Sequence, residues 1–127
     1  MRSAASIPWD VLIEVPAEGR YARVVRTSTA TCAVLEGFDV DQLGDVRLLV
    51  DEVFLAMVAG GARRVELHIA LRTRRILLEL VAHHDGERAR READAGFVHT
   101  LAGVLATDVT VELDRDPPRF AATIAAI

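Results

Sequence analysis

Apolar and polar side chains alternate along several stretches of the chain, which is the pattern of a strand that buries one of its two faces. The alternation predicts five strands, at residues 9–15, 65–71, 76–82, 109–113 and 120–127. The second and third stretches are joined by the short basic segment 72–75 and are expected to form a β-hairpin. A turn at residues 114–118 joins the last two stretches into a second hairpin.

In other stretches apolar residues recur every three or four positions, which predicts helices. The first helix begins near Arg20 and is ended by Gly37. Because Cys32 lies on its apolar side, this thiol is expected in the core rather than as a reactive group. The predicted apolar face of this helix consists of Tyr21, Val24, Val25, Ser28, Cys32 and Leu35.

The second helix has a clear start and end. Asp39 is a predicted N-cap, and Gln42, three residues further on, completes a capping box. Gly60 and Gly61 end the helix. The residues that it is expected to bury are Leu43, Val46, either Leu49 or Val50, Val53 and Met57. A charged loop at residues 87–92 and a third helix near residues 97–105 follow the first hairpin.

The order of elements is therefore strand, helix, helix, hairpin, helix, hairpin. It predicts one α+β domain, residues 1–127, built as a two-layer α/β sandwich. The expected sheet is mixed but mostly antiparallel, with about five strands and with three helices on one face.

Composition excludes several classes of protein. A hydrophobic content of 51% excludes a disordered chain, and a net charge of −4 argues against a strongly basic nucleic-acid binder. All 15 basic residues are arginine, so a phosphate-binding loop that needs lysine is excluded. A single cysteine allows no intrachain disulfide, and no stretch has the roughly 18 apolar residues of a membrane span. A cytoplasmic protein without a membrane partner is expected.

Two adjacent carboxylates, Asp51 and Glu52, interrupt the apolar run of the second helix. A carboxylate on a mostly buried helix is costly unless it is bound or opens onto a cleft. Ala56 lies one turn beyond Glu52, so no second polar ligand stands beside this carboxylate. Glu52 is therefore either a carboxylate at a cleft rim, paired with a nearby arginine, or a catalytic base.

The order of elements, together with three stretches, resembles the GHKL ATPase fold and, more closely, the RsbW-like anti-sigma-factor serine kinases. The first stretch is Tyr21-Ala22-Arg23-Val24, the second leads from Leu43 to Asp51-Glu52-Val53, and the third runs from Leu101 to Val109. The resemblance covers nearly the whole chain, from about residue 9 to residue 127.

In this family a Glu-x-x-x-Asn box binds magnesium, with the glutamate orienting a water or hydroxyl. Glu52 matches the glutamate, as a vestigial base, but Ala56 stands at the asparagine position. A methyl group cannot ligate Mg²⁺, which requires oxygen ligands. No metal is therefore expected to bind there.

The other nucleotide motifs are degenerate too. His84 stands where the family has the aspartate that accepts the adenine amino hydrogens, unless Asp85 takes that role after a one-residue slip. Gly86 matches one glycine of that motif, Gly96 keeps one glycine of two in the phosphate motif, and the lid is shortened. Losing several charge-assisted contacts, each worth roughly 1.5–3 kcal/mol, takes a micromolar binder to millimolar or weaker. ATP and Mg²⁺ are implied by the resemblance alone, and no cofactor is expected.

The resemblance implies a regulatory protein that binds a sigma factor or a STAS-type antagonist through its first helix and its second-helix region. Members of the family commonly form homodimers, so a homodimer is a further expectation. Arg23, with Arg20 beside it, is the expected partner-binding residue. An arginine face that is simply solvated is the alternative. The alternative function is an active ATP-dependent serine kinase with Glu52 as base, and a third is a structural subdomain.

The sequence pattern assigns no metal-binding or catalytic role to the histidines. His83 and His84 are adjacent at a strand end, where successive side chains point to opposite faces, so they are not expected to share a metal ion. His68 and His99 are expected to be ordinary surface or rim residues.

Overall fold

The computed structural model describes residues 7–84 and 96–127. Its elements are β1 (Val11–Pro16), the 3-10 turn η2 (Gly19–Tyr21), α1 (Ala22–Leu35), α2 (Val40–Ala59), β2 (Arg64–Arg72), β3 (Arg75–His83), α3 (Gly96–Leu105), β4 (Asp108–Glu112) and β5 (Arg119–Ala125). This order confirms the predicted α+β class. The predicted loop at 87–92 lies outside the described residues.

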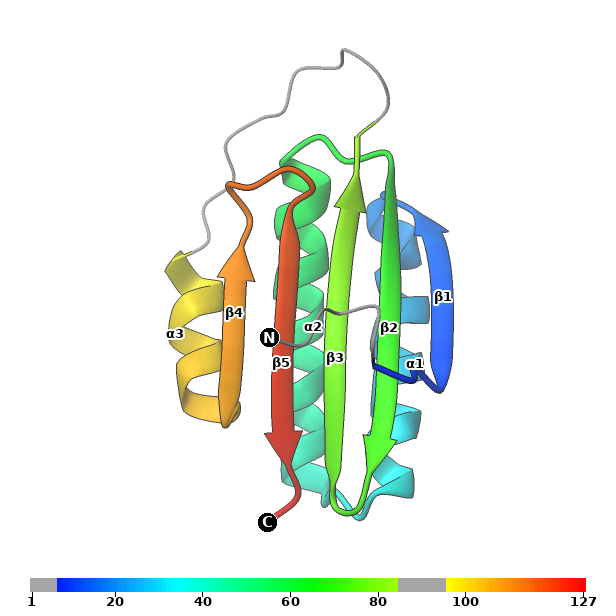
Figure 1. The fold of residues 1–127 in the computed structure, drawn as a ribbon, viewed down its shortest axis with the longest axis vertical. Helices are drawn as coiled ribbons and strands as arrows, with labels where there is room; N and C mark the ends of the chain where they lie inside the picture. Colours follow the sequence, from blue (N-terminus) through cyan, green and yellow to red (C-terminus); the bar gives the residue numbers. More distant parts are fainter. Residues whose placement is uncertain (1–6, 85–95) are drawn as a thin grey trace.

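The sheet has five strands in the order β1-β2-β3-β5-β4 (Figure 1). Every neighbouring pair is antiparallel, so the prediction of a mixed sheet is wrong. The physical reason lies in the connections. The two hairpins reverse the chain directly, and the α1–α2 pair returns it so that β2 runs against β1. β3 and β5 also run in opposite directions, which leaves no parallel pair.

The helices lie on one face of the sheet and leave the other face open (Figure 1). The strands turn their apolar side toward the helices, and the core forms between the two layers. Residues with at most 1% exposure in this core include Val53, Phe54, Val65, Ile69, Ile76, Leu80 and Phe120. Burial of this apolar surface is the main force that holds the two layers together. The result is the two-layer sandwich that the order of elements predicts.

The ends of α2 follow the prediction. The Asp39 carboxylate accepts a hydrogen bond from the backbone N–H of Gln42 at 2.8 Å, and the Gln42 side chain accepts from the backbone N–H of Asp39. This capping box satisfies two donors at the helix start. Leu49 and Val50 are both fully buried, so the alternative between them is resolved in favour of both.

The predicted apolar face of α1 is wrong in part. Val24 and Leu35 are exposed, whereas Thr29 is fully buried. Thr29 can be buried because its hydroxyl donates to the carbonyl oxygen of Val25 at 2.8 Å. The true buried face is Ala22, Val25, Thr29, Ala30, Cys32 and Ala33. Small residues on this face let α1 approach α2 and the sheet closely, so packing rather than hydrophobicity decides the face.

Cys32 and Gly37 of the first helical segment both lie where the sequence predicts them. Cys32 is buried as predicted, and burial, followed by the charge of Asp10, raises the pKa of its thiol. Gly37 ends α1 with φ of +87°, in the left-handed region that glycine adopts without strain. Within the described part of the chain, no helix is long and apolar enough to cross a membrane.

Candidate functional site

The side of α2 that carries Glu52 forms a row with a four-residue step. Glu52, Ala56 and the helix C-cap Gly60 follow one another along this side. Glu52 is half-buried and has no hydrogen bond or ion pair with the described residues. The expected pairing of Glu52 with an arginine is therefore absent from the described part of the chain.

The neighbouring carboxylate, Asp51, takes that arginine instead. Arg26 of α1 donates from Nη1 to Asp51 Oδ2 at 2.8 Å, and both side chains are partly buried. Asp51 Oδ1 is buried and has no hydrogen-bond partner among the described residues. Successive helical residues point about 100° apart, which explains why α1 reaches one carboxylate and not the other.

His84 lies at the end of this row. Its Nε2 atom is 3.1 Å from the carbonyl oxygen of Gly60. A carbonyl only accepts, so Nε2 carries the hydrogen, and the neutral ring keeps a lone pair on Nδ1. Nδ1 is buried and has no partner among the described residues. The structure thus brings three of the expected motif positions, Glu52, Ala56 and His84, to one side of α2.

The remaining nucleotide-motif residues are only partly described. Gly96 is the first residue of α3 and is exposed. Asp85 and Gly86 lie outside the described residues. At the position where the resemblance implies a magnesium ligand, the Ala56 methyl group cannot act as one, and Asp51 is already bound by Arg26. No set of three or more histidine, cysteine, aspartate or glutamate side chains within residues 7–84 and 96–127 is arranged to hold a metal ion.

The start of α1 carries a hollow lined by arginines. Gly19, Arg20, Ala22, Arg23 and Arg26 surround a space of about 430 Å³. Arg20 lies beside the Tyr21 ring and forms an exposed ion pair with Glu18 at 3.4 Å. Arg23 is exposed, and its guanidinium has no partner among the described residues. The two arginines that the sequence analysis selected are thus brought together with Arg26.

The same side of the molecule carries exposed leucines. Leu48 and Leu55 of α2 are 43% and 44% exposed and are seven residues apart, so they lie on one stripe of the helix. Asp51 lies between them on that stripe and contacts Arg26 of α1. The Arg26–Asp51 ion pair therefore joins the arginine hollow of α1 to the exposed leucine stripe of α2.

The open face of the sheet carries a polar chain that the sequence analysis did not identify. Glu66 contacts His83 Nε2 at 2.8 Å and His68 Nε2 at 2.9 Å, and His68 Nδ1 lies 3.0 Å from Glu79. Glu79 in turn accepts from Arg119 Nε at 2.6 Å and is also contacted by Nη2. This row of polar contacts, here called the polar chain, crosses three strands, β2, β3 and β5. It corrects the prediction that His68 is an ordinary surface residue, because the His68 side chain is 14% exposed.

Contacts within the polar chain shift the pKa of the Glu66 carboxyl. Burial tends to raise the pKa of the Glu66 carboxyl, but hydrogen bonds and charge from His68 and His83 together outweigh it, so the pKa lies below its ordinary value of 4.5. Glu79 is 3% exposed, which is unusual for a carboxylate on the open face of a sheet. Such burial is tolerated because Arg119 and His68 supply its partners.

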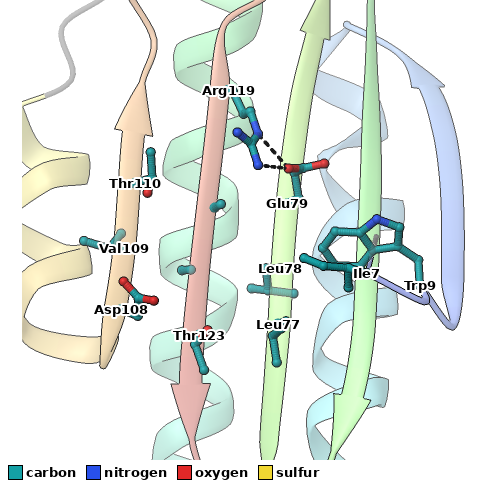
Figure 2. A pocket seen from close by; sticks show the side chains of 12 residues that line it. Ile7, Trp9, Leu77, Leu78, Glu79, Asp108, Val109, Thr110, Arg119 and Thr123 are labelled. Atoms are coloured by element: carbon teal, nitrogen blue, oxygen red, sulfur yellow. Dashed lines mark hydrogen bonds and ion pairs between the residues drawn. The ribbon is translucent and has the colours of Figure 1, made fainter. Parts of the chain in front are cut away.

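Beside this chain the open face is hollowed over β3, β5 and β4 (Figure 2). The hollow has a volume of about 190 Å³. The small residue Ala121 is part of its lining. Ile7 and Trp9 stand on one side of it, and Asp108 and Thr110 stand on the other (Figure 2). The Trp9 ring packs against the His68 ring, with centroids 5.4 Å apart.

No protein-family model matches the chain, and no curated protein matches it.

Proposed function

We propose that this chain is a regulatory protein-binding module of the anti-sigma-factor type, and that it holds its partner on the surface formed by the arginine hollow of α1 and the exposed leucines of α2. The partner class is a sigma factor or a STAS-type antagonist, as the sequence resemblance implies. The observation that carries the proposal is the arginine hollow at the start of α1, where Arg23 has no partner among the described residues.

The chemistry of this α1–α2 surface suits contact with a protein partner. Arginine forms bidentate pairs with carboxylates and stacks on aromatic rings, and arginine is enriched among the residues that dominate interface energies. Leu48 and Leu55 add apolar surface beside the hollow. A central apolar contact with charged groups at its border is the usual composition of a protein interface.

The Glu52–Ala56 row on α2 favours a protein-binding function over phosphoryl transfer. Phosphoryl transfer requires metal ions that bridge and neutralise the phosphates. Ala56 stands where the family ligates magnesium, and Glu52 makes no contact that would orient it among the described residues. The proposed module therefore acts by holding its partner.

The test is capture of partners from the native lysate, followed by identification of the captured proteins. The wild-type chain is expected to retain a sigma factor or STAS-domain protein, and Arg23→Glu is expected to lose it. Arg75→Glu is the matched control, because it makes the same charge change at the β2–β3 turn, at the opposite end of the sheet from the start of α1 (Figure 1). Absence of any such partner, or equal loss in both variants, contradicts the proposal.

A second candidate is retained nucleotide binding, with the alternative kinase activity. One observation favours it: His84 Nδ1 is a buried acceptor with no partner among the described residues, at the position that accepts the adenine amino group in the family. Calorimetric titration with ATP and Mg²⁺ tests it, on the wild type and on Ala56→Asn with His84→Asp. Micromolar binding by the wild type would favour the kinase, whereas no heat up to millimolar ATP would exclude it.

A further inference from the structure

The polar chain on the open face is separate from the α1–α2 surface and has chemistry of its own. It runs from His83 through Glu66, His68 and Glu79 to Arg119, with contacts of 2.6–3.0 Å in addition to the Arg119 Nη2 contact. Strand register explains its path, because His68 is the cross-strand partner of Glu79 and Glu66 lies two residues from His68 on the same face.

His68 is the link on which the chain depends. Both of its ring nitrogens lie within 3.0 Å of a carboxylate oxygen, Nε2 beside Glu66 and Nδ1 beside Glu79. A carboxylate only accepts hydrogen bonds, and a neutral imidazole has one N–H. A neutral His68 would therefore face one carboxylate with a lone pair, whereas an imidazolium donates to both.

The charges around His68 agree with an imidazolium. On β3, Glu79 faces Arg119 of β5, and in register Glu112 of β4 lies beyond Arg119. On β2, Glu66 is shared with His83. On β1, the cross-strand partner of His68 is the apolar Leu12, and the next carboxylate, Glu14, is paired with Arg64 at 2.9 Å. Ahead of β1, Asp10 accepts from the backbone N–H of Leu71. Glu66 and Glu79 are thus the carboxylates in contact with His68, and an imidazolium with Arg119 balances them.

Trp9 connects this charge to the shape of the open face. Its ring packs against the His68 ring at a tilt of 49°, with the ring centroids 5.4 Å apart. With Ile7, Trp9 forms one side of the hollow (Figure 2). A cationic ring is attracted to the indole face, and the attraction falls when the ring becomes neutral. Loss of a proton from His68 therefore weakens both a carboxylate contact and the Trp9 contact.

We propose that the Glu66–His68–Glu79–Arg119 chain is a proton-dependent latch. It holds Trp9 on the open face while both ring nitrogens of His68 carry hydrogens, and it loosens Trp9 when one of those hydrogens leaves. Because Trp9 forms a side of the hollow, the latch sets the shape of this hollow.

Trp9 is the sole tryptophan, so its fluorescence reports directly on the latch. The measurement is quenching by acrylamide from about pH 5.5 to about pH 9, the range in which imidazole rings titrate in proteins. Quenching is expected to rise about twofold or more across this range, the change in a closed-to-open ratio that loss of one hydrogen bond produces. His68→Gln is expected to make the quenching independent of pH. Far-UV circular dichroism over the same range separates local release from unfolding.

Two histidine variants serve as matched controls. His99→Gln changes an exposed histidine of α3, and His83→Gln removes the ring that contacts Glu66 from its other side. Both are expected to keep the pH response. The proposal is wrong if quenching of the wild type does not change with pH. It is also wrong if quenching of His68→Gln changes with pH as that of the two controls does.

If His68→Gln does not fold, nitrogen NMR of the wild type decides the question. Both ring nitrogens of His68 are expected to be protonated at about pH 5.5, and the Trp9 indole signal is expected to shift as one proton is lost. An indole signal that does not move over that titration overturns the proposal.

Discussion

At the scale of single residues, Glu79 is the one charged side chain among the buried residues of the described structure. Its carboxylate is 3% exposed and depends on Arg119 and His68 for every contact found within residues 7–84 and 96–127. Removing a partner from a buried ion pair leaves an uncompensated charge, which costs far more than the pair contributes when it is intact. Glu79 therefore makes the stability of the sheet sensitive to Arg119.

Arg119→Ala is expected to lower the free energy of unfolding by about 3 kcal/mol, because Glu79 stays buried and keeps only its contact with His68. Urea unfolding followed by circular dichroism measures the change. Arg64→Ala is the control, since the Arg64–Glu14 pair is exposed and such pairs contribute about 1 kcal/mol or less. Equal effects of the two substitutions would show that burial of Glu79 has no energetic consequence.

Glu66→Gln is expected to change how stability depends on acid. The pKa of Glu66 is lower in the folded chain than its ordinary value of 4.5, so its charge stabilises the fold above that value, and this stability is lost as the pH falls through the folded pKa. The variant has no carboxyl to titrate, so its free energy of unfolding falls less steeply than that of the wild type between about pH 5 and about pH 3. Urea unfolding at a series of pH values measures both slopes, and identical slopes would contradict the assignment.

At the scale of elements, α2 sets the position of both surfaces on the helical layer. It begins at the Asp39–Gln42 capping box and presents Asp51 to α1 and the Glu52–Ala56 row on a neighbouring side. Gln42 also donates to the carbonyl oxygen of Ala125 at 3.1 Å, so the same residue connects the helix start to the end of β5.

Asp39→Ala is expected to cost about 1 kcal/mol of stability, because it removes the side chain that caps the α2 N-terminus. Asp41→Ala is the matched control: Asp41 lies in the first turn without a side-chain cap bond, so it contributes only a few tenths of a kcal/mol through the helix dipole. Chemical denaturation of both variants measures the difference. An Asp39→Ala change no larger than that of Asp41→Ala would mean that the cap bonds do not stabilise α2.

The elements themselves were predictable, because each one has a local signal. Alternation marked the strands, and the capping residues and glycines marked the ends of α2. The buried face of α1 was not predictable in the same way. Close packing buries its alanines and Thr29, whereas Val24 and Leu35 are exposed. A prediction from hydrophobicity alone therefore selects the wrong face of α1.

The candidate sites, too, could be predicted from the sequence only in part. Arg20 and Arg23 were selected by residue type, and they line one hollow. Glu52 was expected to pair with a nearby arginine, whereas Arg26 pairs with Asp51, because helical phase rather than residue type decides the pairing. The open-face chain was missed although a signal for it existed. With a two-residue turn at Thr73–Arg74, hairpin register places His68 opposite Glu79. The contact of Arg119 with Glu79 depends on a strand pairing between β3 and β5 that no local pattern specifies.

At the scale of the whole molecule, the two faces have different chemistry. The helical layer carries the arginine hollow and the row on α2, and the open face carries the polar chain and Trp9. We propose that the helical layer binds a protein partner through Arg23, and that this binding needs no nucleotide.

The most direct test is calorimetric titration of the captured partner into the wild type, Arg23→Glu and Arg75→Glu, with and without Mg-ATP. Arg23→Glu is expected to weaken binding by about tenfold or more, as for a charged residue that contributes over 1 kcal/mol to an interface. Arg75→Glu and Mg-ATP are expected to leave the affinity unchanged. Equal affinities of Arg23→Glu and the wild type, or binding that requires Mg-ATP, would contradict this account.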